Sequence, residues 1–390
     1  MHLLAIESSC DDTCAAVLCA DAPHWRAPRL SSNVVSSQLI HAEYLGVVPE
    51  LASREHLRLL GPVVREALEQ AGVEWDQIDA VAVTNGPGLI GSLLIGLSYA
   101  KALAFGLRIP LVGVNHVEGH LAAVALEFGE ERAAPPFVGL VASGGHTEIV
   151  HVTEWGCWEL LGATRDDAAG EAFDKVAKLL ELGFPGGPAL SRLAENGDPH
   201  AYAFPRAWLG VEKGGLEMSF SGLKTAVKLF LDKRGWPERP TDETDRARFL
   251  ADVAASFEAA VVDVLARKLL EAARQTGVHR LIVSGGVAAN RALRNRLEAD
   301  AANGGAELLL PPLRLCGDNA AMIGMAGIHR LRANQHSRLD LAAIPNLDDW
   351  SGFYEPAADP TATPGGAEPA GAMACRTAKV ARDEASTADS

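Results

Sequence analysis

The chain has 390 residues, of which 48% are hydrophobic and 22% are charged, as is ordinary for a soluble globular protein of one or two domains. Its formal net charge of −15 argues against a protein that coats nucleic acid by bulk electrostatics, although it allows a local basic patch. The sequence contains no C-x-x-C pair, no signal-peptide pattern and no apolar run that is long enough to span a membrane. We therefore expect a cytoplasmic protein with reduced thiols and no membrane association.

The first predicted elements form a hairpin. Leu3–Glu7 and Ala15–Cys19 have the patterns of buried strands, and the polar turn Ser8–Thr13 joins them. A helix is predicted over Pro49–Ala71, with a proline at its start and Gly72 as its stop.

A unit of strand, glycine-rich loop and helix comes next. The strand Asp79–Thr84 leads into the loop Asn85–Gly91, and an apolar helix follows to about Phe105. Another apolar strand is predicted over Pro110–Val114.

The histidine pair that follows this strand is the strongest single feature of the chain. Asn115 is a good N-cap for a helix. His116 and His120 are four residues apart and would share one helix face, where two imidazoles can bind one metal ion. Two surface histidines near a helix start are the alternative interpretation.

The second half of the chain repeats this architecture. Phe137–Ala142 and Thr147–Val152 are predicted strands that flank the turn Ser143–His146, and Arg280–Val283 precedes the glycine-bearing segment Ser284–Arg291. We interpret this as an internal duplication in an α/β protein. Further helices are predicted over Arg165–Leu182, Ser221–Lys233, Glu243–Thr276 and Gly317–Asn334, and the composition from Pro356 onward predicts a disordered tail.

Three turns rich in glycine, serine or aspartate are candidate phosphate sites, namely Ser8–Thr13, Ser143–His146 and Ser284–Asn290. Backbone N–H groups in such turns bind phosphate oxygens, although most glycine pairs are only turns. Two hairpin turns and a strand–glycine–helix unit together indicate a nucleotide held in a cleft between two lobes.

Three further features could bind a substrate or a metal ion. Asp167, Glu171 and Asp174 fall on one face of a predicted helix, as acceptors for ribose hydroxyls or as a solvated face. Phe184–Pro188 is interpreted as a rigid loop, either a wall against a base or a plain turn. Asp318 is either an N-cap or the third ligand of a set of two histidines and one carboxylate, which suits iron and tolerates zinc.

Ten segments, taken in order over about residues 3–350, resemble the TsaD family of tRNA adenosine threonylcarbamoyltransferases. They are Ile6–Asp11 (IESSCD), Gly46–Arg54 (GVVPELASR), Gly86–Leu89 (GPGL), Asn115–His120 (NHVEGH), Ser143–Thr147 (SGGHT), Asp166–Lys175 (DDAAGEAFDK), Phe184–Pro188 (FPGGP), Ser219–Thr225 (SFSGLKT), Gly285–Arg291 (GGVAANR) and Cys316–Asn319 (CGDN). Any one segment is modest, but their order is very specific.

The resemblance implies the actin-like ATPase (ASKHA) fold, with two RNase-H-like lobes and a nucleotide cleft between them. The expected N-terminal lobe is 1–115, on which a last helix of about 325–350 packs back. The expected C-terminal lobe is 116–324, and 356–390 is the expected disordered tail.

The resemblance also implies the reaction. The threonylcarbamoyl group of threonylcarbamoyl-AMP passes to the exocyclic amine of the adenosine 3′ to the anticodon, in tRNAs that read codons beginning with A, and AMP leaves. The implied partners are an inactive paralogue and a small ATPase of the same pathway.

The resemblance assigns site residues as well. The implied ligands of one divalent metal, iron before zinc, are His116, His120 and Asp318. The implied contacts of the acyl-adenylate are Val141, Ala142, Ser143, Gly144, Gly145, Asp174, Gly187 and Asn290. A catalytic role for Asp12 is only weakly implied, because the family often has a glutamate there, which is one methylene longer.

Three other classes of protein compete with this interpretation. A metal-dependent peptidase with H-E-x-x-H needs a glutamate beside the first histidine, whereas Glu118 lies two residues on and about 200° around a helix from His116. A sugar kinase of the same fold would share the hairpin turns but needs no His-x3-His. A non-enzymatic scaffold would keep the fold with an inactive cleft.

Overall fold

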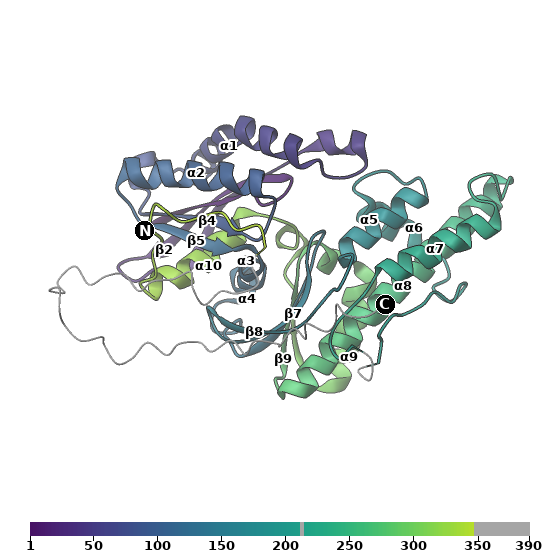
Figure 1. The fold of residues 1–390 in the computed structure, drawn as a ribbon. Helices are drawn as coiled ribbons and strands as arrows, with labels where there is room; N and C mark the ends of the chain where they lie inside the picture. The colour runs from purple at the N-terminus through teal and green to yellow at the C-terminus, as the bar shows by residue number, and fades with distance from the viewer. Residues whose placement is uncertain (211–213, 347–390) are drawn as a thin grey trace, which may run out of the picture.

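The computed structural model describes residues 1–210 and 214–346, so the predicted tail from Pro356 lies outside the described residues. The chain is an α/β protein with two five-stranded sheets (Figure 1). The strand order is β3-β2-β1-β4-β5 in the first sheet and β10-β9-β6-β7-β8 in the second. In each sheet an antiparallel meander of three strands is extended by two parallel strands, which confirms the predicted repetition of architecture.

The strands of the first sheet are β1 His2–Glu7, β2 Asp12–Asp21, β3 Arg26–Ser37, β4 Ala80–Gly86 and β5 Leu111–Asn115. Those of the second sheet are β6 Phe137–Ala142, β7 Thr147–Glu154, β8 Cys157–Ala163, β9 Arg280–Ser284 and β10 Glu307–Leu309. The sequence did not predict β3, β8 and β10, each of which is an edge strand. The edge strand β5 is fully buried and was predicted, whereas these three strands are partly exposed and lack the continuous apolar run that identified the others.

The α-helices are α1 Pro49–Ala71, α2 Ile90–Leu107, α3 His116–Ala122, α4 Ala125–Phe128, α5 Ala169–Leu179, α6 Gly186–Ala194, α7 Ser221–Arg234, α8 Glu243–Thr276, α9 Arg291–Gly304 and α10 Ala320–Arg332. Short 3-10 helices span Leu39–Tyr44, Trp75–Gln77, Gly286–Ala289 and Leu313–Leu315. The predicted ends of α1 and α8 are confirmed, because Gly72 and Gly277 adopt the left-handed conformation there.

Three predicted boundaries were wrong. The helix predicted from Arg165 begins only at Ala169, and the predicted loop Phe184–Pro188 contains the first turn of α6. Within the described residues, the segment around 325–350 is helical only as far as Arg332.

The two sheets enclose a central layer of helices. Helices α1 and α2 pack on one face of the first sheet, and α10 packs on its other face (Figure 1). Helix α3 joins α10 in a core that includes side chains from both sheets, such as Ala82 and Phe137. Gly327 allows α10 to approach the first sheet closely, because a Cβ atom there would lie 2.7 Å from the Cβ of Ala82. Helix α8 packs on the second sheet, and α5 and α7 contribute to the same core.

Contrary to the expectation from the sequence, one described helix, α2, is long and apolar enough to cross a membrane by length and composition alone. It packs against α1 and β4, and its residues Leu97 and Ala100 belong to the core of the first sheet. Core helices of globular proteins meet the same test, so this finding is weak evidence for a membrane span.

Candidate metal centre between the two sheets

The three predicted metal ligands converge in the central layer. Asn115 ends β5 and caps α3, since its Oδ1 accepts hydrogen bonds from the N–H groups of Val117 and Glu118 at 2.6 and 3.2 Å. The cap sets the start of the helix, so His116 and His120 share one face with ring centroids 4.7 Å apart.

Asp318 comes to the same place from the far end of the sequence. It directly precedes Asn319, the N-cap of α10, and its Oδ1 lies 3.5 Å from His116 Nε2 and 3.2 Å from His120 Nε2. One possible ligand atom from each of the three residues lies within 4.8 Å of the others. Two imidazoles and a carboxylate at this spacing fit a divalent transition metal.

A buried carboxylate behind the histidines sets their orientation. Glu7 is fully buried at the end of β1, and its Oε2 accepts a hydrogen bond from His116 Nδ1 at 3.0 Å and another from Thr84 Oγ1 at 2.5 Å. The bond leaves His116 Nε2 facing Asp318, which is the usual arrangement of a metal-binding histidine. Sequence reasoning missed Glu7, although a glutamate that ends an apolar strand was a visible signal.

The charges of this cluster are strongly coupled. Burial opposes protonation of His116, but Asp318 and Glu7 outweigh it and raise its pKa to about 9. Burial raises the pKa of Asp318, yet His116 and His120 outweigh it and hold the pKa of that carboxyl well below its usual range. Burial lowers the pKa of His120, whose Nδ1 makes no hydrogen bond within the described residues. The site is therefore built to hold positive charge.

His146 adds a third imidazole that the sequence analysis did not single out. Its ring centroid lies 5.7 Å from that of His116. Burial and the neighbouring His116 and His120 lower the pKa of His146 to about 4, so the ring is neutral at neutral pH. The sequence could have indicated His146 through its position in the glycine-rich turn that follows β6.

The turn between β6 and β7 lies against α5. Ser143 closes the turn, because its N–H donates to the carbonyl of His146 at 2.7 Å. A Cβ atom at Gly170 would lie 2.5 Å from the Ser143 carbonyl oxygen, so only glycine fits there. Gly144 and Gly145 are exposed at the tip of the turn.

The side chains at the C-terminal end of β6 are not accessible to a ligand. Val141 and Ala142 are both fully buried in the sheet. Any contact that these two residues make with an adenylate must therefore come from their backbone.

Asp174 and Gly187 do meet in space. Asp174 Oδ1 accepts hydrogen bonds from the N–H groups of Gly186 and Gly187 at 2.8 and 3.2 Å, and so caps α6. The predicted acidic helix face was wrong at Asp167, which precedes α5 and forms ion pairs with Lys175 and Lys224, both at 2.7 Å.

Asn290 lies at the start of α9, and its side chain forms hydrogen bonds with other residues of the protein. Its Oδ1 accepts a bond from the N–H of Leu293 at 2.8 Å, and its Nδ2 donates to Ser191 Oγ at 2.9 Å and to Glu258 Oε1 at 2.5 Å. The residue thus joins α6, α8 and α9. Sequence reasoning missed Glu258, because a single glutamate in the long α8 carries no motif.

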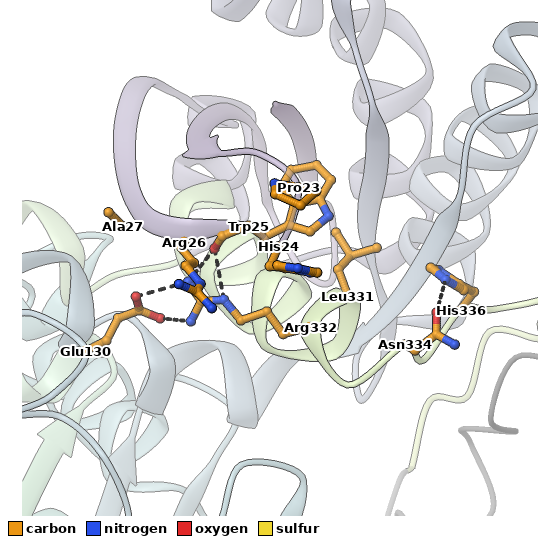
Figure 2. A pocket seen from close by; sticks show the side chains of 10 residues that line it. All are labelled: Pro23, His24, Trp25, Arg26, Ala27, Glu130, Leu331, Arg332, Asn334 and His336. Atoms are coloured by element: carbon orange, nitrogen blue, oxygen red, sulfur yellow. Dashed lines mark hydrogen bonds and ion pairs between the residues drawn. The ribbon is translucent and has the colours of Figure 1, made fainter.

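Asp12 and Glu118 lie in buried, charged surroundings near the metal centre. Asp12 opens β2, and burial together with Asp318 raises its pKa to about 7. Glu118 Oε2 lies 2.6 Å from Arg330 Nη2 in a buried ion pair, so it is not a general base for a metallopeptidase. A cavity of about 710 Å³ lies elsewhere, between the β2–β3 turn and the end of α10 (Figure 2).

The fold and the site define the class of the protein, a two-lobed protein of the actin-like ATPase fold with a histidine–carboxylate centre between its lobes. Its structure is similar to HypF from T. kodakarensis, with a TM-score of 0.54 and 16% identity over 84% of this chain and 48% of HypF. It is also similar to a full-length HypF in a phosphate- and nucleotide-bound form, with a TM-score of 0.53 and 15% identity over 85% of this chain and 55% of HypF. These likenesses concern the fold alone.

Sequence comparison identifies the family. The TsaD model, described as tRNA N6-adenosine threonylcarbamoyltransferase, matches residues 29–325. The chain is 49% identical over 346 residues to a protein of that name from Clostridioides difficile (strain 630), across 88% of this chain and 97% of the relative. It is 51% identical over 346 residues to one from Symbiobacterium thermophilum, across 88% of this chain and 96% of the relative. The chain belongs to the TsaD family.

Proposed function

We propose that this chain is a tRNA N6-adenosine threonylcarbamoyltransferase. It transfers the threonylcarbamoyl group of threonylcarbamoyl-AMP to the exocyclic amine of the adenosine 3′ to the anticodon, in tRNAs that read codons beginning with A, and it releases AMP. Family membership supports this function. The observation that carries it is the convergence of His116, His120 and Asp318 between the two lobes.

In this proposal His116, His120 and Asp318 hold one divalent metal, iron in preference to zinc. When bound there, such an ion would supply Lewis-acid stabilisation of negative charge that develops on substrate oxygens. Glu7 keeps the His116 ring in place through its hydrogen bond at 3.0 Å. The N–H groups at the exposed tip of the turn, Gly144 and Gly145, are suited to bind the single phosphate of the adenylate.

The nucleoside side of the site involves two different kinds of residue. Asp174 offers its second carboxylate oxygen to the ribose, while Oδ1 caps α6. Both N–H groups of the Asn290 amide are already donated to Ser191 and Glu258. We therefore assign to Asn290 the task of holding the wall formed by α6 and α9, and not a hydrogen bond to adenine.

Asp12 is the proposed acceptor of the proton that the adenosine amine loses. A general base works best with a pKa near the working pH, and the pKa of Asp12 is raised to about 7 by burial and by Asp318. Adenosine's amine is a poor nucleophile, so its positioning must supply much of the rate.

We also propose that the enzyme works in the cytoplasm with tRNA and with two protein partners, an inactive paralogue and a small ATPase. The paired helices α1 and α2 expose large apolar side chains to solvent, among them Leu57 and Phe105, which are 72% and 73% exposed. An exposed apolar face of this kind is suited to cover by another protein.

Removal of the histidine pair tests the metal assignment. The double variant His116→Ala/His120→Ala should lose bound metal, measured by elemental analysis, and should lose transfer activity. The matched control His24→Ala/His200→Ala removes two exposed histidines and should retain both. Full metal content in the first variant would sink the assignment.

A further inference from the structure

A buried ion pair that the proposed chemistry does not use connects the two helices of the metal centre. Glu118 on α3 and Arg330 on α10 are 2% and 4% exposed, and Arg330 Nη2 lies 2.6 Å from Glu118 Oε2. Arg330 Nη1 also donates to Gln335 Oε1 at 3.0 Å. Burial of both charges is costly unless the geometry is good, which indicates a specific role for the pair.

The pair lies at a second point of contact between the elements that supply the metal ligands. Glu118 stands between the two histidines but points away from their face. Arg330 lies ten residues after Ala320, the first residue of α10, which is about 15 Å along the helix axis. The first point of contact is Gly119, where a Cβ atom would lie 2.8 Å from Ile323 Cδ1. Apolar side chains of both helices, such as Val117 and Met322, share one core, and the ion pair adds a directional polar contact near the C-terminal end of α10.

A turn of the second sheet also packs against the guanidinium of Arg330. A Cβ atom at Gly156, in the turn between β7 and β8, would lie 2.5 Å from Arg330 Nη1. In the same turn Trp155 stacks on His329, with ring centroids 4.2 Å apart. Arg330 is thus held by α3 and by the second sheet, while its own helix packs on the first sheet.

We propose that Glu118 and Arg330 are a positioning pair for the metal centre. By holding α3 at a fixed angle to α10, the pair keeps His116 and His120 at the distance from Asp318 that one ion requires. The proposal rests on the proposed metal centre. Loss of a group that hydrogen-bonds a metal ligand directly weakens metal affinity by about 10–100-fold, and we expect an effect in this range from a pair that acts through the backbone of the two helices.

The experiment measures Zn²⁺ affinity by competition with a chelator, and the visible spectrum of the Co²⁺-loaded protein. Glu118→Gln should weaken Zn²⁺ binding by about 10–100-fold and change the Co²⁺ spectrum at saturation. The control is Glu130→Gln, which alters the ion pairs that Glu130 makes with Arg332 (Figure 2) and with His329 of α10, neither of which includes a residue of α3. Its affinity and spectrum should match those of the wild type.

A second variant covers the case in which the single change unfolds the protein. Glu118→Met/Arg330→Met removes both buried charges, and such apolar replacements are often neutral or stabilising. Its melting temperature should recover while its Zn²⁺ affinity stays weak. Wild-type affinity in either a folded Glu118→Gln variant or the double variant would overturn the positioning role, as would equal weakening by Glu130→Gln. A wild-type chain that binds no metal would instead refute the metal centre itself.

Discussion

At the scale of the residue, Asp174 combines two roles that substitution can separate. Its Oδ1 caps α6 through the N–H groups of Gly186 and Gly187, and its other oxygen is proposed to bind the ribose. An asparagine keeps an acceptor for the cap, whereas an alanine does not. The two substitutions therefore report on different functions of one side chain.

We predict that Asp174→Ala weakens binding of AMP by about 1.5–3 kcal/mol, because a bond to a charged group is lost. It should also destabilise the protein by about 0.5–2 kcal/mol through loss of the cap. Asp174→Asn should weaken AMP binding but leave the melting temperature close to that of the wild type. Calorimetric titration and thermal unfolding check these values. Unchanged AMP affinity in Asp174→Ala would remove Asp174 from the site.

At the scale of the element, the N-terminus of α7 is capped by the carboxylate of Asp166, which is distant in the sequence. Asp166 Oδ1 accepts bonds from the N–H groups of Phe220 and Ser221 at 2.8 and 3.1 Å, and Oδ2 accepts from the hydroxyls of Ser219 and Ser221, both at 2.6 Å. Burial opposes ionisation, but these bonds outweigh it and lower the pKa of Asp166 to about 2. The motif around Ser219 therefore serves to start a helix.

This cap predicts a pH dependence. Because the folded pKa of Asp166 is depressed, its contribution to stability is full above the unfolded value of about 3.9 and is lost as pH falls through about 2. Asp166→Ala should cost about 1 kcal/mol in urea unfolding at pH 7. The stability gap between wild type and variant should begin to shrink below about pH 4. A gap that stays constant or widens in acid would contradict this assignment.

The packing of α5 on the turn after β6 gives a steric prediction. A Cβ atom at Gly170 would meet the backbone of Ser143, which cannot move away as a flexible side chain could. Gly170→Ala should therefore destabilise the protein by about 1–3 kcal/mol and weaken AMP binding through the displaced turn. Gly222→Ala in α7 is the matched control, since its Cβ would enter open space. Equal stability of the two variants would show that the turn is free to shift.

At the scale of the whole molecule, the strands that could be predicted from the sequence were those with a continuous run of buried apolar residues. The hairpin turns after β1 and β6 stand between strands whose residues are nearly all buried, so their pattern was clear. The edge strands β3, β8 and β10 were not predicted, because many of their residues are exposed or only partly buried. The histidine pair was visible from its spacing, but the pairing of His116 with Glu7 and of Glu118 with Arg330 was not, because only the folded chain brings these distant residues together.

The central claim is that the chain transfers an acyl group from an adenylate to tRNA. The most direct measurement is incubation with threonylcarbamoyl-AMP and unmodified tRNA, with partner proteins added where needed, followed by nucleoside mass spectrometry and AMP quantification. We predict the threonylcarbamoyl mark on adenosine with one AMP released for each mark, and no mark with the His116→Ala/His120→Ala variant. ATP-dependent phosphorylation of a small sugar, with no change to tRNA, would mean that the fold was right and the function wrong.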